Sequence, residues 1–231
     1  MDDTIAALEE AVYEYMLENY GDEGWAIHPN DRNGYALSEQ YDDEFGEHVG
    51  DIVRAFQRSP GFFLNMKPIK GSIEAIHEMM DEGIDVVFCS TPYRLSLTVR
   101  DEKAKWISKY FPEGSYKDWL TKLVLTHRKY DQYGHFLIDD SPHMTRKPHT
   151  KWKQIFAAKK YNEDCSPRLE DWSKWRDVVY PILREQGFKM VDGQWGKEPT
   201  SKIVLTVPNL PPFASVRSAI EDFAARIISR N

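Results

Sequence analysis

The chain has only two cysteines, Cys89 and Cys165, in 231 residues, too few for the disulfide framework of a small secreted domain. No apolar run approaches the roughly 18 residues of a membrane-spanning helix, and the acidic start MDDTIAALEE lacks the basic region of a signal peptide. Basic residues are also in deficit, with 30 Lys and Arg against 37 Asp and Glu and a net charge of −7. We therefore expect a cytoplasmic protein that binds neither a membrane nor a nucleic acid polymer, although a local cluster of donors can still bind a small phosphate.

What is present is the composition of a folded domain. Hydrophobic residues make up 41% and charged residues 29% of the chain, which is close to average globular usage and sufficient for a sizeable core. The length allows one large domain, or a core with a smaller insert.

The pattern alternates between strands and helices from Lys67 onward. Continuous apolar runs predict buried strands over 84–90, 123–126 and 135–139. Helical spacing and stop signals predict the other elements. These are helices over 3–20, 44–58, 68–83, 95–111, 151–160, 168–186 and 216–229, and a further strand over 202–208. Strand–helix alternation is typical of an α/β domain with a mostly parallel sheet.

Three of the predicted strands end in polar residues of a particular kind. Ser90 and Thr91 follow the first strand, Lys129 follows the second, and Asp139 and Asp140 end the third. Ligands of such sheets bind at the carboxyl ends of the strands. Hydroxyls, a lysine and paired carboxylates are the groups that a magnesium-dependent phosphoryl-transfer site needs.

Each of these features also has a purely structural explanation. Ser90 and Thr91 would cap the next helix, Lys129 would be a solvated loop lysine, and Asp139 and Asp140 would be turn residues. Their joint occurrence at the ends of successive strands, in this order, favours a site over three coincidences.

The segments FCSTP, LTHRK and LIDDSP, in this order, resemble motifs II, III and IV of the haloacid dehalogenase (HAD) phosphatase superfamily, and more narrowly the 5'(3')-deoxyribonucleotidases. GFFLNMKPIKGSIEAIHEM and LEDWSKW also resemble segments of that family, so that the resemblance covers about residues 1–180. It implies a HAD-like, Rossmann-like, doubly wound and mostly parallel sheet with a small helical cap inserted after motif I. The implied core is 1–17 and 67–186, the cap 18–66, and the C-terminal extension 187–231.

The start of the chain departs from the family pattern, which opens with D-x-D-G. There the first Asp is the nucleophile and the second is the general acid/base. Asp2 matches the second, so the nucleophile position falls immediately before Met1. Three explanations compete: truncation of the described chain, a natural pseudo-enzyme, or a central strand supplied by another segment such as 202–207. We favour truncation, because removing a central strand would leave its two neighbours with unpaired backbone groups and an apolar void.

The resemblance implies a 5'-nucleotidase-type phosphatase, a phosphoric monoester hydrolase that uses Mg²⁺ and an aspartyl-phosphate intermediate to hydrolyse (deoxy)nucleoside monophosphates. Asp2 and Lys129 would be catalytic, and Ser90, Thr91 and Lys129 would bind phosphate. Asp139, Asp140 and the carbonyl of Asp2 would bind magnesium. The cap aromatics that are candidates to stack on the base are Trp25, Tyr35, Tyr41, Phe62 and Phe63. The alternative for each of them is a place in the cap's own core.

Without its nucleophile the chain is expected to be inactive. The alternatives are a non-catalytic nucleotide- or phosphate-binding pseudo-enzyme with a HAD fold, and an interaction module in which the C-terminal extension matters most. Extra packing or an oligomer contact is the expected role of that extension, and a homodimer is an open prediction.

Overall fold

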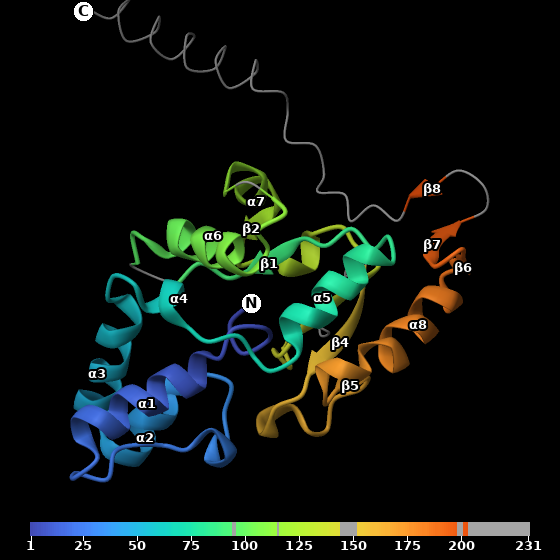
Figure 1. Ribbon diagram of the computed structural model, residues 1–231. Helices are drawn as coiled ribbons and strands as arrows, with labels where there is room; N and C mark the ends of the chain where they lie inside the picture. The colour runs from blue at the N-terminus through green and yellow to red at the C-terminus, as the bar shows by residue number, and fades with distance from the viewer. Residues whose placement is uncertain (94–95, 115, 144–151, 198–200, 203–231) are drawn as a thin grey trace, which may run out of the picture.

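The computed structural model describes residues 1–93, 96–114, 116–143, 152–197 and 201–202 (Figure 1). The helices are α1 (Leu8–Tyr20), α2 (Leu37–Phe45), α3 (Glu47–Arg58), α4 (Phe62–Asn65), α5 (Ser72–Asp81), α6 (Val99–Tyr110), α7 (Tyr116–Lys122) and α8 (Trp175–Glu185). The strands are β1 (Phe88–Ser90), β2 (Leu123–Leu125), β3 (Phe136–Asp139), β4 (Lys153–Ala157), β5 (Arg168–Leu169), β6 (Lys189–Val191), β7 (Gln194–Lys197) and β8 (Ser201–Lys202). The helix predicted over 216–229, and all but the first residue of the strand predicted over 202–208, lie outside the described residues.

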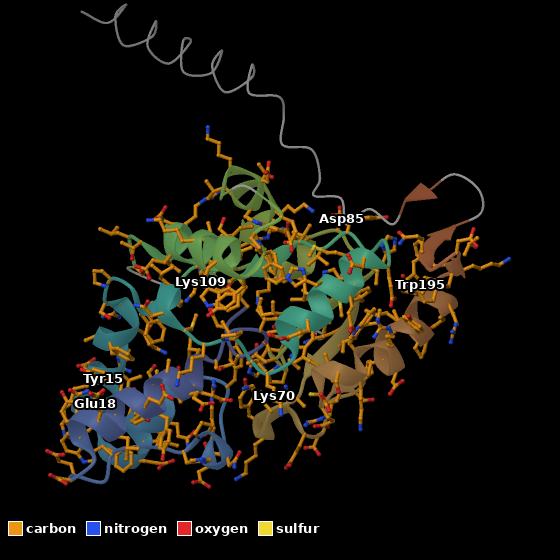
Figure 2. All side chains as sticks on the ribbon, viewed as in Figure 1. Tyr15, Glu18, Lys70, Asp85, Lys109 and Trp195 are labelled. Atoms are coloured by element: carbon orange, nitrogen blue, oxygen red, sulfur yellow. The ribbon has the colours of Figure 1, made fainter. Side chains whose placement is uncertain are left out.

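The strands form two parallel sheets and one antiparallel sheet. β1 pairs with β2, and β3, β4 and β5 pair in that order, all in parallel. β6, β7 and β8 form an antiparallel sheet after α8. The parallel strands β1 and β2 are connected through α6 and α7, and this combination of helices with parallel strands confirms the predicted α/β class. Side chains from the helices and the strands meet in the interior of the molecule (Figure 2). Among the described helices, none combines the length and the apolar character needed to cross a bilayer.

The first residues of the chain form a tight turn at the ends of the parallel strands, and α1 begins only at Leu8. The carbonyl of Met1 accepts hydrogen bonds from the N–H groups of Thr4, Ile5 and Ala6, at 3.1, 2.9 and 3.0 Å. Asp3 has a φ of 51°, in the left-handed region, which is unfavourable inside a helix. The helix predicted from residue 3 is therefore shorter at its start, and the first residues lie in the middle of the molecule (Figure 1).

The helix predicted over 44–58 is α3, which begins at Glu47, and it is preceded by α2 (Leu37–Phe45), which was not predicted. The chain turns at Gly46, whose φ is 94°, a conformation that glycine adopts without steric cost. The absence of a side chain at Gly50 allows the two helices to approach closely, since a Cβ there would lie 1.8 Å from Asp42 Oδ1. Arg54 on α3 links the two helices by donating hydrogen bonds to both carboxylate oxygens of Asp42 on α2, at 2.7 and 2.9 Å.

The helix predicted over 151–160 is wrong, because the structure has a strand there. In β4, the residues from Gln154 to Ala157 are all buried, and they lie between β3 and β5. A strand buried on both faces has a continuous apolar run, and the flanking lysines made this short run resemble an amphipathic helix. The segment 168–186 is helical mainly in α8, since its first residues form β5.

The carboxylate of Glu102 on α6 binds the start of α4. It accepts hydrogen bonds from the N–H groups of Gly61 and Phe63, at 2.8 and 3.1 Å. We expect Glu102→Ala to lower the free energy of unfolding by about 3 kcal/mol, because one buried and one half-buried N–H donor lose a charged acceptor. Urea denaturation measures this loss. Asp101→Ala is the matched control: Asp101 pairs with Lys105 at the surface of the same helix, so about 0.5 kcal/mol is expected there. Equal losses in the two variants would contradict the expectation.

Candidate active site

The polar residues predicted at the strand ends lie together. A pocket at the carboxyl ends of β1 and β3 is lined by Asp2, Ser90, Thr91, Lys129 and Asp140. Ser90 is the last residue of β1, and Asp139, beside Asp140, is the last residue of β3. The structure therefore brings the predicted catalytic, phosphate-binding and metal-binding candidates to one edge of the fold.

Lys129 and Asp139 form a buried ion pair. Lys129 Nζ is 2.6 Å from Asp139 Oδ2, and side-chain exposure is 6% and 1%. The other oxygen of Asp139 accepts the N–H of Ser141 at 3.1 Å. Burial alone would lower the pKa of Lys129, but the charge and hydrogen bond of Asp139 outweigh it, so the pKa lies above its usual value. The lysine is thus a fixed positive charge at the pocket.

The carboxylate of Asp2 is held by Lys103, a residue that the sequence analysis missed. Lys103 Nζ lies 2.6 Å from Asp2 Oδ2 and 2.7 Å from Ser90 Oγ, with its side chain fully buried. Burial opposes ionisation of Asp2, but the charge of Lys103, with that of the Met1 amino group, brings its pKa below the usual value. Nothing in the helical pattern marks Lys103, because a lysine on an amphipathic helix normally reaches solvent.

The Thr4 hydroxyl lies between two candidate metal ligands. Its oxygen is 3.3 Å from Asp140 Oδ1 and 3.3 Å from the carbonyl oxygen of Asp2. The second oxygen of Asp140 accepts the Tyr161 hydroxyl at 2.5 Å. Burial, and then the charges of Asp139 and Asp3, raise the pKa of Asp140 to about 7. This carboxylate therefore lies in an excess of negative charge that a cation would relieve.

A second buried ionic cluster lies beside the pocket, around Arg32. Arg32 Nη1 is 2.7 Å from Asp3 Oδ2 and 2.9 Å from Glu9 Oε2. Its guanidinium also donates to the carbonyls of Gly34 and Tyr35. These contacts fix the loop that carries Tyr35 against the start of α1. The sequence analysis did not identify Arg32, since a single arginine in a polar loop carries no local signal.

The five aromatic candidates fall into two groups. Tyr35 lines the pocket, and its ring lies 5.9 Å from that of Tyr161. The others pack elsewhere: Trp25 stacks on Tyr20, Tyr41 is fully buried with its hydroxyl bonded to the N–H of Ile27, and Phe62 and Phe63 pack against each other. Tyr93, which was not predicted, also lines the pocket. Base stacking by any of the five stays a prediction.

The oxygen atoms at the pocket match an open magnesium site, which keeps water and phosphate ligands, better than a metal site enclosed by protein ligands alone. Within the described ranges, no group of three or more His, Cys, Asp and Glu residues is arranged to hold a metal ion. Magnesium in phosphoryl-transfer sites is typically held by one or two carboxylates, with water and substrate phosphate as the remaining ligands. One carboxylate and one carbonyl that share the Thr4 hydroxyl are compatible with that pattern.

A hydroxyl, a lysine and paired aspartates gathered near the carboxyl ends of parallel strands are the arrangement expected of the HAD-superfamily phosphatases that the sequence resembles. Comparison with known families gives the particular one. The chain belongs to the family described as "5' nucleotidase, deoxy (Pyrimidine), cytosolic type C protein", whose match covers residues 1–188. The predicted family is thereby confirmed, and with it the 5'-nucleotidase type of phosphatase.

Individual relatives agree with this assignment. The chain is 32% identical over 151 residues to a Bordetella parapertussis protein named "Putative 5'(3')-deoxyribonucleotidase", a match that covers 64% of this chain and 76% of the relative. It is 27% identical over 187 residues to the Homo sapiens protein "5'(3')-deoxyribonucleotidase, mitochondrial", covering 78% and 79% of the two chains. The Homo sapiens protein "5'(3')-deoxyribonucleotidase, cytosolic type" is 28% identical over 156 residues, covering 64% and 75%.

Proposed function

We propose that this protein is built to hydrolyse (deoxy)nucleoside monophosphates to nucleoside and phosphate with Mg²⁺. The observation that carries the proposal is the convergence of Asp2, Ser90, Lys129 and Asp140 on one pocket. The names of the relatives support the substrate class. In this proposal Ser90, Thr91 and Lys129 bind the phosphate oxygens, and the charge of Lys129 offsets that of the phosphate.

Asp2 is the proposed general acid and base. A carboxylate placed immediately before Met1 would attack phosphorus, forming a bond to phosphorus while the ester bond breaks. Asp2 would give a proton to the leaving nucleoside oxygen, and would then take one from the water that cleaves the aspartyl-phosphate. Lys103 keeps the pKa of Asp2 low as the site stands. The negative charges of a bound phosphate and of a neighbouring carboxylate would raise that pKa towards the range that an acid needs.

Asp140, the carbonyl of Asp2 and, beside them, Asp139 are the proposed holders of Mg²⁺. The ion would supply positive charge that offsets the phosphate and the carboxylates around it. Asp139 already pairs with Lys129, so Asp140 is the more direct of the two aspartates. Tyr161 and Thr4, which bond its two oxygens, orient this carboxylate.

The segment 18–66, which contains α2 and α3, is the proposed cap over a core of 1–17 and 67–186. Arg32 fixes the loop that brings Tyr35 to the pocket, where its ring is available to contact the nucleoside. A cap at this place would exclude water from the reacting phosphate. A packing or oligomer-contact role for the extension 187–231, and a homodimer, stay proposals. A cytoplasmic location also stays a proposal, since one relative is named as cytosolic and another as mitochondrial.

The test compares three chains that differ only before Met1. The 231-residue chain is expected to hydrolyse no phosphomonoester, because the covalent step has no acceptor. A chain with an apolar strand ending in Asp joined before Met1 is expected to gain magnesium-dependent phosphate release. The same strand ending in Asn is the matched control and is expected to stay inactive. Robust turnover by the 231-residue chain would refute this alignment, and nucleotide binding without turnover in the Asp-extended chain would favour the non-catalytic alternative.

A further inference from the structure

The two carboxylate oxygens of Asp140 have different partners. Oδ2 accepts a hydrogen bond from the Tyr161 hydroxyl at 2.5 Å, whereas Oδ1 lies 3.3 Å from the Thr4 hydroxyl. A hydrogen bond from a hydroxyl to a carboxylate is strong at the shorter of these distances, and the longer distance lies beyond the usual range for two oxygens. The carboxylate is therefore held firmly through Oδ2 and only weakly through Oδ1.

The single proton of the Thr4 hydroxyl has two acceptors. Thr4 Oγ1 lies 3.3 Å from Asp140 Oδ1 and also 3.3 Å from the carbonyl oxygen of Asp2, and a hydroxyl carries only one proton. Two oxygens with negative charge thus converge where the described residues supply one donor. Oxygens of this kind are the ligands of hard cations, and Oδ1, rather than Oδ2, is the oxygen that Asp140 presents to such an ion.

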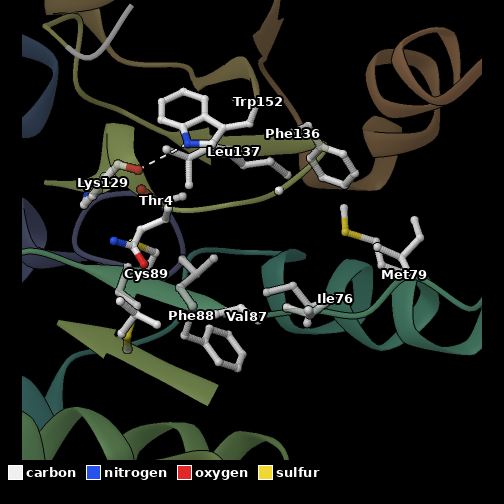
Figure 3. Close-up of a pocket in the computed structure, with 18 of the residues that line it drawn as sticks. Thr4, Ile76, Met79, Val87, Phe88, Cys89, Lys129, Phe136, Leu137 and Trp152 are labelled. Atoms are coloured by element: carbon white, nitrogen blue, oxygen red, sulfur yellow. Dashed lines mark hydrogen bonds between the residues drawn. The ribbon is translucent and has the colours of Figure 1, made fainter. Parts of the chain in front are cut away.

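Both oxygens of the neighbouring Asp139 are already engaged. Oδ2 pairs with Lys129 Nζ at 2.6 Å, and Oδ1 accepts the N–H of Ser141 at 3.1 Å. Lys129 is also anchored at its backbone, because its carbonyl accepts a hydrogen bond from the indole N–H of Trp152 at 3.2 Å (Figure 3). A cation at this edge of the fold would therefore depend on Asp140, and on one oxygen of it.

Tyr161 is held in place through its ring and through the adjoining backbone. The guanidinium of Arg32 lies over the ring, 4.6 Å from its centroid, and the ring of Tyr35 contacts it edge-on, with 5.9 Å between the centroids. The next residue, Asn162, is buried and donates from Nδ2 to the carbonyl of Asp140 at 2.8 Å. These contacts keep the Tyr161 hydroxyl at Oδ2, so this oxygen is not released by rotation of an unrestrained side chain.

A carboxylate restricted to one oxygen suits Mg²⁺ better than Ca²⁺. Mg²⁺ requires near-octahedral geometry with oxygens at about 2.0–2.1 Å and retains several water ligands, so one oxygen per carboxylate is sufficient. Ca²⁺ takes roughly 6–8 oxygens at about 2.3–2.6 Å, and a carboxylate that binds through both oxygens supplies two of them. Blocking one oxygen of Asp140 therefore disfavours Ca²⁺ more than Mg²⁺.

We propose that Tyr161 is a positioning residue that sets the metal specificity of the site: its hydroxyl restricts Asp140 to coordination through one oxygen, and this makes the site select Mg²⁺ over Ca²⁺. The inference rests on the proposed function, because it takes the magnesium site at Asp140 and the carbonyl of Asp2 as given. Sequence analysis did not identify Tyr161, which follows β4 in a segment for which the pattern predicted a helix.

Tyr161→Phe tests the proposal, because it removes the hydroxyl and leaves the ring against Arg32. The unfolding temperature of the 231-residue chain is measured at pH 8 and constant ionic strength with increasing Mg²⁺ or Ca²⁺, and its rise gives the Kd of each ion. We expect the ratio of the Ca²⁺ Kd to the Mg²⁺ Kd to fall at least about tenfold in Tyr161→Phe, since Oδ2 becomes available to the larger ion.

Tyr180→Phe is the matched control. The Tyr180 hydroxyl also donates to a carboxylate, that of Glu82 at 2.8 Å, between α8 and α5, and the ratio is expected to stay unchanged there. Infrared difference spectra on adding Ca²⁺ give a second readout, because the two carboxylate stretching bands lie closer together when both oxygens bind the ion. We expect this change in Tyr161→Phe, but neither in the parent chain nor in the double variant Tyr161→Phe, Asp140→Asn.

The outcomes separate this inference from the proposed function. Equal weakening of both ions in Tyr161→Phe would give Tyr161 a purely structural role and overturn the proposal. An unchanged ratio would also overturn it, and if Asp140→Asn abolishes binding of both ions, the magnesium site itself stands. Mg²⁺ binding that persists in Asp140→Asn, or a parent chain that binds neither ion, would instead remove the magnesium site of the proposed function, and this inference with it.

Discussion

Lys129→Met is expected to abolish binding of inorganic phosphate, and to lower turnover at least about 100-fold in a chain that carries an aspartate before Met1. Lys129 Nζ pairs with Asp139 Oδ2 at 2.6 Å in a buried position. Without the lysine, the pocket lacks the positive charge that would attract the phosphate oxygens and offset the neighbouring carboxylates. Calorimetric titration with phosphate measures the binding, and unchanged affinity would move Lys129 to the role of a purely structural lysine.

The same substitution is expected to destabilise the fold, since removing one partner of a buried ion pair costs about 3–5 kcal/mol. The double variant Lys129→Met, Asp139→Asn separates the two effects. It leaves no uncompensated charge, so stability is expected to recover, while phosphate binding stays lost. Lys153→Met is the matched control, because Lys153 pairs with Glu185 at the surface. It is expected to change stability by no more than about 0.5 kcal/mol and to leave phosphate binding intact.

Asp140→Asn is expected to make the metal-free chain more stable at pH 8, and to abolish turnover in the Asp-extended chain. The pKa of Asp140 is raised from 3.8 to about 7 in the folded protein. Between these values the folded state binds more protons than the unfolded state, so stability falls as the pH rises from about 4 through about 7. At about 1.4 kcal/mol per pKa unit, the full loss is on the order of 4 kcal/mol. Asparagine has no such titration.

Thermal unfolding at pH 5 and pH 8 in the presence of a chelator measures this effect. The parent chain is expected to lose stability between the two values, and Asp140→Asn is expected to lose less. Asp131→Asn serves as control, since Asp131 pairs with Arg128 near the surface and should leave the pH dependence unchanged. The same pH dependence in the parent chain and in Asp140→Asn would show that Asp140 is not the group that titrates. Adding Mg²⁺ at pH 8 should stabilise the parent chain more than Asp140→Asn.

The sequence identified the residues whose position follows from local pattern. Ser90, Asp139 and Asp140 are found at the pocket because each ends or follows a buried strand, and parallel strands bring such ends to one edge. Lys103 and Arg32 were not found. Lys103 reaches Asp2 across 101 positions of the chain, and Arg32 reaches Asp3 across 29. Such contacts depend on how helices and loops pack on the sheet, which periodicity does not specify.

The failure to predict that β4 is a strand has the same explanation. Its four buried residues are too few to distinguish a strand from a helix by periodicity, and pairing with β3 and β5 decides the outcome. For the five aromatic candidates, the resemblance implied a place in the cap and a base-stacking role. Packing placed only Tyr35 at the pocket and the others among their neighbours.

The ionic cluster around Arg32 couples the loop that carries Tyr35 to the first turn of the chain. Arg32 Nη1 pairs with the carboxylates of Asp3 and Glu9. Its Nε and Nη2 donate to the carbonyls of Gly34 and Tyr35. Asp3 directly follows Asp2, so a displacement of the loop is transmitted to the residue that adjoins the phosphate pocket. Opening the loop alone would require two buried ion pairs to separate. We therefore expect the loop that carries Tyr35 and the backbone of Asp2 to move together rather than independently.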